Sequence, residues 1–366
     1  MSSQSPSSPI LRDASGALVI VSHDQVVAVA HDPAGFSNNV SRHLQIPNGL
    51  DGPAHTAARR LLDPFLAGER VNALEPKLAA IAEELVAEFH DGHSFDAVAE
   101  LGARYSVRAQ SAWLGWPAEL EQTLLEWVRD HRQAARESTQ GAHADVARRF
   151  DEIVSQLLQE RRERPRHDVT TELVELRDED GMALSDEQII SVLRNWTGGD
   201  LNSVALCVGV VVAWLARHRE HQAQLAALAG KDPPEAAQLL DHAIDEILRA
   251  DDPFVSNRRR ATNDTSVAGC PVASGEVVVL DWRRANRDPA VFGDPDSFDP
   301  QTHAAANLVY GTGAHACPGR TLATRELRVL TQALLGAGRL VMDGPAALRR
   351  EHDPDIIRSV RVRIEG

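Results

Sequence analysis

The chain has 366 residues, 43% hydrophobic and 25% charged, which is the ordinary balance of a globular protein with a large core. Its 38 Lys+Arg against 53 Asp+Glu give a net charge of −15, which argues against nucleic acid or an anionic membrane as the main partner. Three scattered cysteines are too few for a disulfide framework and indicate a reducing, cytoplasmic setting. Cys207 and Cys270 are expected to be small buried hydrophobes; Cys317 has different surroundings.

The amino-terminal part of the chain changes from loops to helices. Residues 1–9, rich in Ser and Pro, predict a disordered leader without the features of a signal peptide. A strand is expected at 17–22, then a helix over 23–32 and a long loop over 36–53. From His55 to about Arg217 apolar residues recur at helical spacing, most clearly in three stretches: 76–90, 119–136 and 144–162.

The rest of the chain contains one long helix and then short strands. Ser185 to Gln188 reads Ser-Asp-Glu-Gln, a capping box that opens a helix ending near Arg217. Its apolar run over 204–216 is shorter than the ~20 residues of a membrane span and indicates a buried helix. The remaining expected elements are a helix over 235–250, strands at 260–265 and 277–280 around a turn at 273–275, a meandering loop over 286–300, a helix over 320–335 and a β-like tail at 360–364. The chain is therefore expected to be mainly α.

One segment combines a cysteine with closely spaced glycines. Residues 310–319 read Tyr-Gly-Thr-Gly-Ala-His-Ala-Cys-Pro-Gly, and Gly311 and Gly319 would let the backbone lie close to a flat partner. The helix expected next would stabilise a thiolate at Cys317 through its amino-terminal dipole. This segment resembles the haem-ligand loop of the cytochrome P450 family, F-x-x-G-x-H/R-x-C-x-G, with Tyr310 at the aromatic position. The resemblance makes Cys317 the thiolate ligand of the haem iron.

A second segment resembles the family's E-x-x-R pair. Glu246 and Arg249 have the i,i+3 spacing of an ion pair on a helix. Family members usually complete this network with a loop arginine. Ser297 and Thr302 occupy the places where that arginine would stand, which leaves His303 as a candidate third partner.

Four cationic or histidine side chains resemble the residues that hold the haem propionates in the family. His55 and Arg59 match H-x-x-x-R, Arg259 lies where the family has another propionate-binding arginine, and His315 lies inside the cysteine loop. Because a guanidinium fork matches a carboxylate well, the resemblance assigns all four to cofactor binding.

The long helix departs from the family at its most characteristic motif. Residues 198–203 read Gly-Gly-Asp-Leu-Asn-Ser where members usually have A/G-G-x-D/E-T-T. Two glycines inside a helix cost about 1 kcal/mol each, which room for haem and dioxygen would explain. The acidic position is Leu201, and the alcohol position is Asn202, which cannot relay a proton as a hydroxyl does. The residues expected to act beside the oxygen are Gly198, Gly199, Asp200, Asn202 and Ser203.

The resemblance implies a mainly α cytochrome P450 fold, a large helical lobe with a small β-rich lobe, in a single haem domain over 10–366. It implies haem b and a monooxygenase that hydroxylates or O-dealkylates a small hydrophobic or aromatic substrate with O2 and electrons from a ferredoxin and its reductase. The arginines expected to dock the ferredoxin are Arg60, Arg320 and Arg325. The residues expected to line the substrate pocket are Phe36, Val40, Leu44 and Ile46.

The loss of the acid–alcohol pair leaves other functions open. A peroxide-driven peroxygenase or a non-oxidative haem enzyme, such as an isomerase or dehydratase, would not need that pair. A haem-thiolate sensor or ligand carrier would keep Cys317 without any electron supply. A helical protein with no haem is the remaining alternative.

Overall fold

The computed structural model describes residues 8–41, 43–89, 92–137, 140–230, 234–344 and 359–366. These residues form two compact units, Met1–Arg60 with Asp245–Pro318 and Leu61–Ile244 with Gly319–Gly366. Most of the expected leader lies outside the described residues, but Pro9 already belongs to the fold, because its carbonyl accepts hydrogen bonds from the amides of Val21 and Ser22. A single haem domain over 10–366 stays a prediction.

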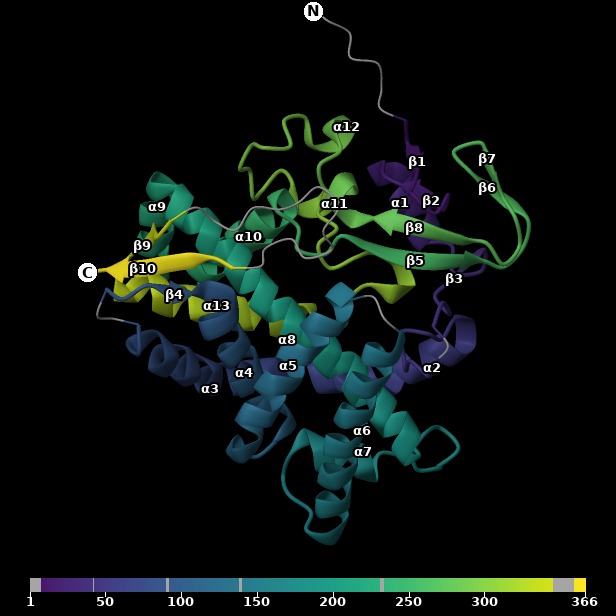
Figure 1. The fold of residues 1–366 in the computed structure, drawn as a ribbon, viewed down its shortest axis with the longest axis horizontal. Helices are drawn as coiled ribbons and strands as arrows, with labels where there is room; N and C mark the ends of the chain where they lie inside the picture. The colour runs from purple at the N-terminus through teal and green to yellow at the C-terminus, as the bar shows by residue number, and fades with distance from the viewer. Residues whose placement is uncertain (1–7, 42, 90–91, 138–139, 231–233, 345–358) are drawn as a thin grey trace, which may run out of the picture. The chain divides into compact units, whose positions relative to one another are not determined.

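The first unit is built on a five-stranded sheet (Figure 1). Its order is β1 (Ile10–Arg12), β2 (Leu18–Ile20), β8 (Val277–Asp281), β5 (Ser256–Ala261) and β3 (Phe36–Ser37), with β2 and β8 parallel and the other pairs antiparallel. Leu18 and Ile20 pair in register with Val278 and Leu280, and all four side chains are buried. The sheet therefore holds the apolar core of this unit.

The strand expected at 260–265 is wrong, because the structure has the parts of two separate strands there. Strand β5 ends at Ala261, and the separate strands β6 (Thr265–Val267) and β7 (Cys270–Val272) pair with each other beyond it (Figure 1). Ala268 and Gly269 have φ of 48° and 79°, the left-handed pair that a tight two-residue hairpin turn needs. The expected strand at 260–265 thus covers the end of β5 and the start of β6.

Short helices and loops complete the first unit. They are α1 (His23–Ala30), the start of α2 (Gly52–Leu62), the end of α10 (Pro234–Ala250), α11 (Trp282–Ala285) and α12 (Pro289–Phe292). The expected meander over 286–300 is thus interrupted by α12. Asp288 caps α12 through Ala290 N and also accepts from His23 N, 2.9 Å away. One carboxylate therefore connects the meander to α1.

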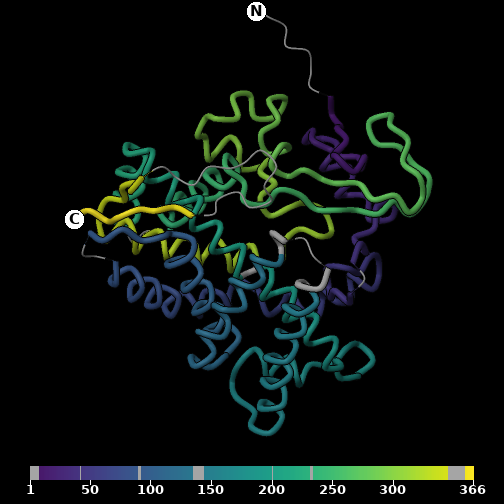
Figure 2. The backbone as a smooth tube through the Cα atoms, in the orientation of Figure 1, coloured from purple at the N-terminus to yellow at the C-terminus, as the bar shows by residue number. Residues whose placement is uncertain are grey.

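The second unit is helical, and Figure 2 follows its backbone from one helix to the next. Its helices are α3 (Gly68–Ala87), α4 (Ala103–Leu114), α5 (Glu121–Glu137), α6 (Gln140–Glu163), α7 (Val169–Glu175), α8 (Asp186–Arg217), α9 (Arg219–Ala229) and α13 (Arg320–Ala337). The expected helix over 76–90 begins earlier, at Gly68. A small sheet of β4 (Phe95–Asp96), β10 (Arg361–Glu365) and β9 (Arg339–Met342) interrupts the expected helical run.

Helix α8 lies in the core of this unit. Its capping box is present: Ser185 accepts from Gln188 N, and the Gln188 side chain accepts from Ser185 N. Among the described residues, α8 is the one helix long and apolar enough to cross a bilayer, yet 65% of its most apolar stretch is buried inside the protein. Core helices meet the same criteria, so the expectation of a buried helix agrees with the structure.

A close backbone contact fixes α8 against the segment Ala97–Gly102 that precedes α4. A Cβ on Gly102 would lie 2.9 Å from the Ala205 carbonyl oxygen and 3.0 Å from that of Ala97. The Ser106 hydroxyl donates to the Leu201 carbonyl oxygen at 3.0 Å. Glycine at position 102 therefore allows the backbones to meet.

Gly102→Ala is expected to lower the free energy of unfolding by about 1–3 kcal/mol, because the new methyl group would overlap backbone atoms that cannot move aside. The φ of Gly102 is −62°, so the loss would report packing rather than backbone strain. Urea unfolding measures the change. Gly336→Ala in α13, where nothing lies within 4 Å of an added Cβ, is the control and should raise stability by about 0.5–1 kcal/mol. Equal effects at both positions would contradict this account.

Candidate functional site

The cysteine loop closes on itself. The Cys317 amide donates to the Tyr310 carbonyl oxygen at 2.8 Å, and the Ala316 amide donates to the Gly313 carbonyl oxygen at 3.1 Å across a short 3-10 turn. Cys317 stands at the end of this ring and is exposed. The backbone bonds therefore present the cysteine on a fixed frame.

Glycine is required in this loop at position 313. Gly313 has φ of +74°, and a Cβ there would lie 2.4 Å from the Ala30 carbonyl oxygen at the end of α1. Next to it, the Thr312 hydroxyl lies 2.8 Å from His31 Nε2. The other two glycines differ: Gly311 also has a positive φ, with open space around it, whereas Gly319 has φ of −82°, a value open to any residue.

The four expected propionate ligands lie in the same unit as Cys317. The rings of His55 and His315 have centroids 4.1 Å apart. Arg59 donates from Nη1 to the carbonyl oxygens of Ala314 and Ala316, at 3.3 and 3.2 Å. Arg59, on α2, thus supports the cysteine loop directly.

The electrostatics of this cluster favour an incoming anion. Arg259 is 5% exposed, and burial lowers the pKa of its guanidinium to about 10, opposed in part by the charge of Asp51. Burial, followed by the electrostatic effect of the neighbouring His55 and Arg259, lowers the pKa of His315 to about 4. His315 is therefore neutral at pH 7, and the buried charge of Arg259 is incompletely compensated. A carboxylate of a bound group would compensate it.

Sequence reasoning missed Asp51. Its Oδ1 accepts from Asn38 N at 3.1 Å and lies 3.3 Å from His315 Nε2, and its Oδ2 accepts from the Ser37 hydroxyl. Because Asp51 lies four residues before His55, an acid at helical spacing from a predicted ligand was the signal available. The carboxylate orients the His315 ring.

The expected pair of Glu246 and Arg249 forms in the interior of the first unit. Arg249 Nε and Nη2 donate to the two oxygens of Glu246 at 2.8 and 2.9 Å, with the side chains 0% and 2% exposed. Arg249 Nη1 also donates to the Asn286 carbonyl oxygen at 2.8 Å, and Nη2 approaches the carbonyl oxygens of Pro295 and Ser297 at 3.1 and 3.2 Å. The guanidinium therefore holds the meander through its backbone.

His303 takes the place of a third partner in this network. Its Nδ1 lies 2.7 Å from Glu246 Oε1, which also accepts from the Asp299 amide at 3.1 Å. Phe292 packs against both side chains, 4.8 Å from the Arg249 guanidinium carbon and 5.2 Å from the His303 ring. Ser297 contributes only its backbone here.

Asn286, also missed from sequence, links this network to the cysteine loop. The side chain is fully buried; Nδ2 donates to Asp252 Oδ2 at 2.7 Å, and Oδ1 accepts from Leu308 N at 2.7 Å. The Leu308 carbonyl oxygen in turn accepts from Gly311 N. Burial raises the pKa of Asp252 to about 7. A continuous chain of bonds thus runs from Arg249 to the start of the loop.

On α8, two of the expected residues leave space, and Leu201 at the family's acidic position is buried. No atom lies within 4 Å of a Cβ placed on Gly198 or Gly199. Asn202 and Ser203 are half-buried, whereas Leu201 is completely buried. Leu201 therefore packs inside the second unit and does not line the open face of the helix; the side chain of Asp200 lies outside the described residues.

Asn202 has a partner that the sequence did not indicate. Arg132 on α5 donates from Nε to Asn202 Oδ1 at 2.7 Å. Both residues belong to the second unit, and α5 packs against α8. The amide at the alcohol position is thus bound to a guanidinium.

Two groups of expected binding residues need correction. The Arg325 guanidinium binds Glu75, which also accepts from Arg328 at 2.8 Å. The charge of Arg325 is therefore used inside the second unit, whereas Arg60 and Arg320 are exposed.

Phe36 is 5% exposed in the core beside the sheet and is not a pocket wall. Val40 and Ile46 are half-buried, and Leu44 is 38% exposed.

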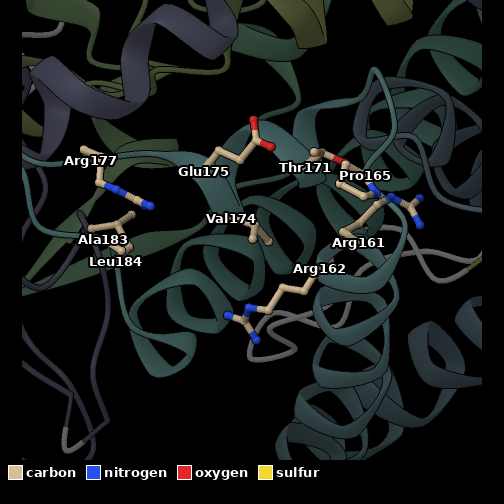
Figure 3. Close-up of a pocket in the computed structure, with 9 residues that line it drawn as sticks. All are labelled: Arg161, Arg162, Pro165, Thr171, Val174, Glu175, Arg177, Ala183 and Leu184. Atoms are coloured by element: carbon tan, nitrogen blue, oxygen red, sulfur yellow. The ribbon is translucent and has the colours of Figure 1, made fainter.

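A surface hollow of about 350 Å³ contains none of the expected residues. It is lined by residues of α6, α7 and the following turn (Figure 3): Arg161, Arg162, Pro165, Thr171, Val174, Glu175, Arg177, Ala183 and Leu184. Arg161 donates to Asp168 at 2.7 Å and to the Gly115 carbonyl oxygen at 2.6 Å. Arg162 pairs with Asp186. Two of its three arginines therefore support local structure.

Removing one member of the buried pair tests its importance. Arg249→Leu is expected to cost about 3–5 kcal/mol of unfolding free energy, because it leaves the Glu246 carboxylate buried without its cation. The double variant Glu246→Leu/Arg249→Leu should be less destabilised than Arg249→Leu, since no charge is stranded. Urea unfolding of the wild type, Arg249→Leu and the double variant decides, and a double variant destabilised as much as Arg249→Leu or more would contradict the argument.

Comparisons with known proteins agree on one family. The family model "Cytochrome P450" matches residues 116–344. The erythromycin C-12 hydroxylase of Saccharopolyspora erythraea is 28% identical over 363 residues, covering 92% of this chain and 85% of the relative. "Probable cytochrome P450 127A1" of Sinorhizobium fredii is 30% identical, covering 86% and 75%.

Solved structures agree with the fold. A mutant of P450 EryK in complex with erythromycin B is similar with a TM-score of 0.83 and 26% identity, covering 98% of this chain and 93% of that one. The himastatin-tailoring hydroxylase HmtN gives a TM-score of 0.85 at 24% identity, covering 99% and 95%. The expected mainly α fold with a small β part is therefore confirmed. The chain belongs to the cytochrome P450 family and is a monooxygenase whose cofactor is haem b, bound through a thiolate.

Proposed function

We propose that Cys317 is the thiolate ligand of the haem iron in this chain. The observation that carries the proposal is the closed loop of residues 310–317, which presents an exposed cysteine on a hydrogen-bonded frame. Cys207 is buried inside α8, and Cys270 lies in the β6–β7 hairpin. Neither has a comparable loop, which leaves Cys317 as the ligand.

The propionates of the haem would be held by His55, Arg59, Arg259 and His315. Support comes from the incompletely compensated charge of Arg259 and from the depressed pKa of His315, which both fit a site that receives anions. A neutral His315 would share a hydrogen bond with a propionate, while Arg259 would supply the opposite charge. Gly311, with open space at its Cα, would allow the porphyrin to lie against the backbone.

The proposed reaction is the insertion of one oxygen atom from O2 into a small hydrophobic or aromatic substrate, by hydroxylation or O-dealkylation. Haem bound through a thiolate supplies the O–O cleavage that this reaction needs. On α8, the described residues leave open space at the Cα atoms of Gly198 and Gly199, which fits a face that receives a small hydrophobic substrate. Related proteins are described as a steroid C26-monooxygenase and a cyclomarin C epoxidase.

The electrons would come from a ferredoxin and its reductase in the cytoplasm. The exposed Arg60 and Arg320 fit an acidic partner of this kind, and Arg325 no longer belongs to the proposed surface. The burial of α8 in the core of its unit fits a protein that functions without a membrane.

A peroxide-driven reaction or a non-oxidative haem reaction is the second candidate. The observation that favours it is the distal helix, where Leu201 is fully buried and Asn202 Oδ1 is bound to Arg132. Neither side chain can pass a proton to oxygen as an acid–alcohol pair would.

Cys317→Ala is expected to abolish the Soret band of thiolate-ligated haem in the absorption spectrum of the reduced protein with carbon monoxide, because no other sulfur stands in the loop. Cys270→Ala and Cys207→Ala should keep the band. A variant without Cys317 that keeps the band, or a wild-type spectrum typical of a nitrogen ligand, would refute the assignment.

Turnover with two oxidant systems separates the candidate reactions. The holoprotein with ferredoxin, its reductase and NAD(P)H is expected to oxidise small hydrophobic substrates, and Asn202→Thr should raise the fraction of electrons that appear in product, because it restores a hydroxyl at the alcohol position. Product formation is measured against NAD(P)H consumption. Activity with hydrogen peroxide alone would instead support the peroxygenase.

A further inference from the structure

The hydrogen bond between Arg132 and Asn202 determines how the Asn202 amide is oriented. Arg132 Nε lies 2.7 Å from Asn202 Oδ1, the short distance typical of a charge-assisted hydrogen bond. A guanidinium has only N–H donors and no acceptor. The atom of the amide that faces Arg132 must therefore be its oxygen, and the NH2 group must point elsewhere.

The amide nitrogen is left for another partner. Among the residues whose side chains the structure describes, no acceptor bonds to Asn202 Nδ2, and this atom is not among the enclosed polar atoms without a partner. The half-buried Asn202 thus offers two N–H donors at an accessible position. A threonine there would present both a donor and an acceptor, whereas this amide presents donors alone.

The position of Asn202 on α8 places these donors on the open face of the helix. Asn202 follows Gly198 and Gly199 by four and three residues, so the three share one helix face. Among the described atoms outside the neighbouring backbone of α8, none lies within 4 Å of a Cβ on either glycine. Leu201, about 100° around the helix from Asn202, is fully buried. The proposed function assigns this open face to the substrate.

We propose that Arg132 is a positioning residue that holds the Asn202 amide with its N–H groups toward the substrate, where they bind a neutral acceptor oxygen such as a carbonyl or ether. The proposal rests on the proposed function and adds a substrate class to it: hydrophobic molecules with an oxygen acceptor near the oxidised carbon. Because the guanidinium draws electron density from Oδ1, it also strengthens the N–H donors.

The test uses the holoprotein and a matched pair of probes, 2-adamantanone and adamantane, which differ by one carbonyl oxygen. Dissociation constants come from the shift of the haem absorption band. Asn202→Asp keeps an oxygen for Arg132 but has no N–H donor, and Arg132→Met removes the guanidinium while keeping an apolar stem. Arg129→Met is the control, since Arg129 lies on the same helix with its side chain 74% exposed.

The preference for ketone over hydrocarbon should fall by about two- to tenfold in Asn202→Asp, the range expected for one neutral hydrogen bond. It should fall by a smaller factor in Arg132→Met, where the amide is free to turn over, and partly recover in Arg132→Lys. The control should keep the wild-type ratio. An equal ratio in wild type, Asn202→Asp and Arg132→Met would overturn the proposal.

The CO stretching frequency of the reduced, CO-bound protein is a second readout that does not need a bound probe. Loss of the N–H donor should shift this frequency in Asn202→Asp and Arg132→Met and leave it unchanged in Arg129→Met. An unshifted frequency in both variants would overturn the proposal, as would a shift accompanied by an unchanged probe ratio. A thiolate-type CO spectrum in every variant shows that the haem is in place; its absence in wild type would instead refute the proposed function.

Discussion

The irregular half of the first unit depends on one buried ion pair. Glu246 and Arg249 are removed from water at a cost of several kcal/mol for each ion, and this cost is offset because their hydrogen-bonding groups find partners. Those partners are mostly backbone atoms of the meander, which has little regular structure of its own. Through Asn286 the same bonds extend to the start of the cysteine loop. The start of the cysteine loop is thereby connected to the ion pair by a continuous chain of hydrogen bonds.

The cluster around Arg259 differs from this ion pair, because its buried charge is incompletely compensated within the protein. Burial lowers the pKa values of both Arg259 and His315, and among the described residues Asp51 is the carboxylate whose charge opposes both shifts. Such an arrangement is unfavourable by itself and becomes favourable when a carboxylate enters. The energetic cost of bringing these groups together would therefore appear as affinity for the haem. The same residues that disfavour the empty fold would favour the loaded one.

The α8 helix shows how a departure from a family pattern can have a structural reason. Leu201 at the acidic position is buried against the segment around Gly102 and Ser106, where a carboxylate would have no water. Asn202 at the alcohol position is fixed by a guanidinium from another helix. The two changes are compatible with each other, since neither leaves a charge without a partner. In place of an acid–alcohol pair, the helix thus carries a buried leucine and an amide bound to a guanidinium.

Patterns within a few neighbouring residues were determined by the sequence alone: the capping box of α8, the i,i+3 pair and the glycine-rich cysteine loop all depend on local spacing. Contacts between distant residues were decided by the tertiary structure. His303 lies 57 positions from Glu246 and Arg132 lies 70 positions from Asn202, while Arg325 meets Glu75 across 250. The sequence offered His303 as a candidate only through the family resemblance, and no local pattern distinguishes Arg132 or Arg325 from ordinary surface charges. Phe36 likewise joined the core only because β3 pairs with β5, since which strands become neighbours depends on the whole fold.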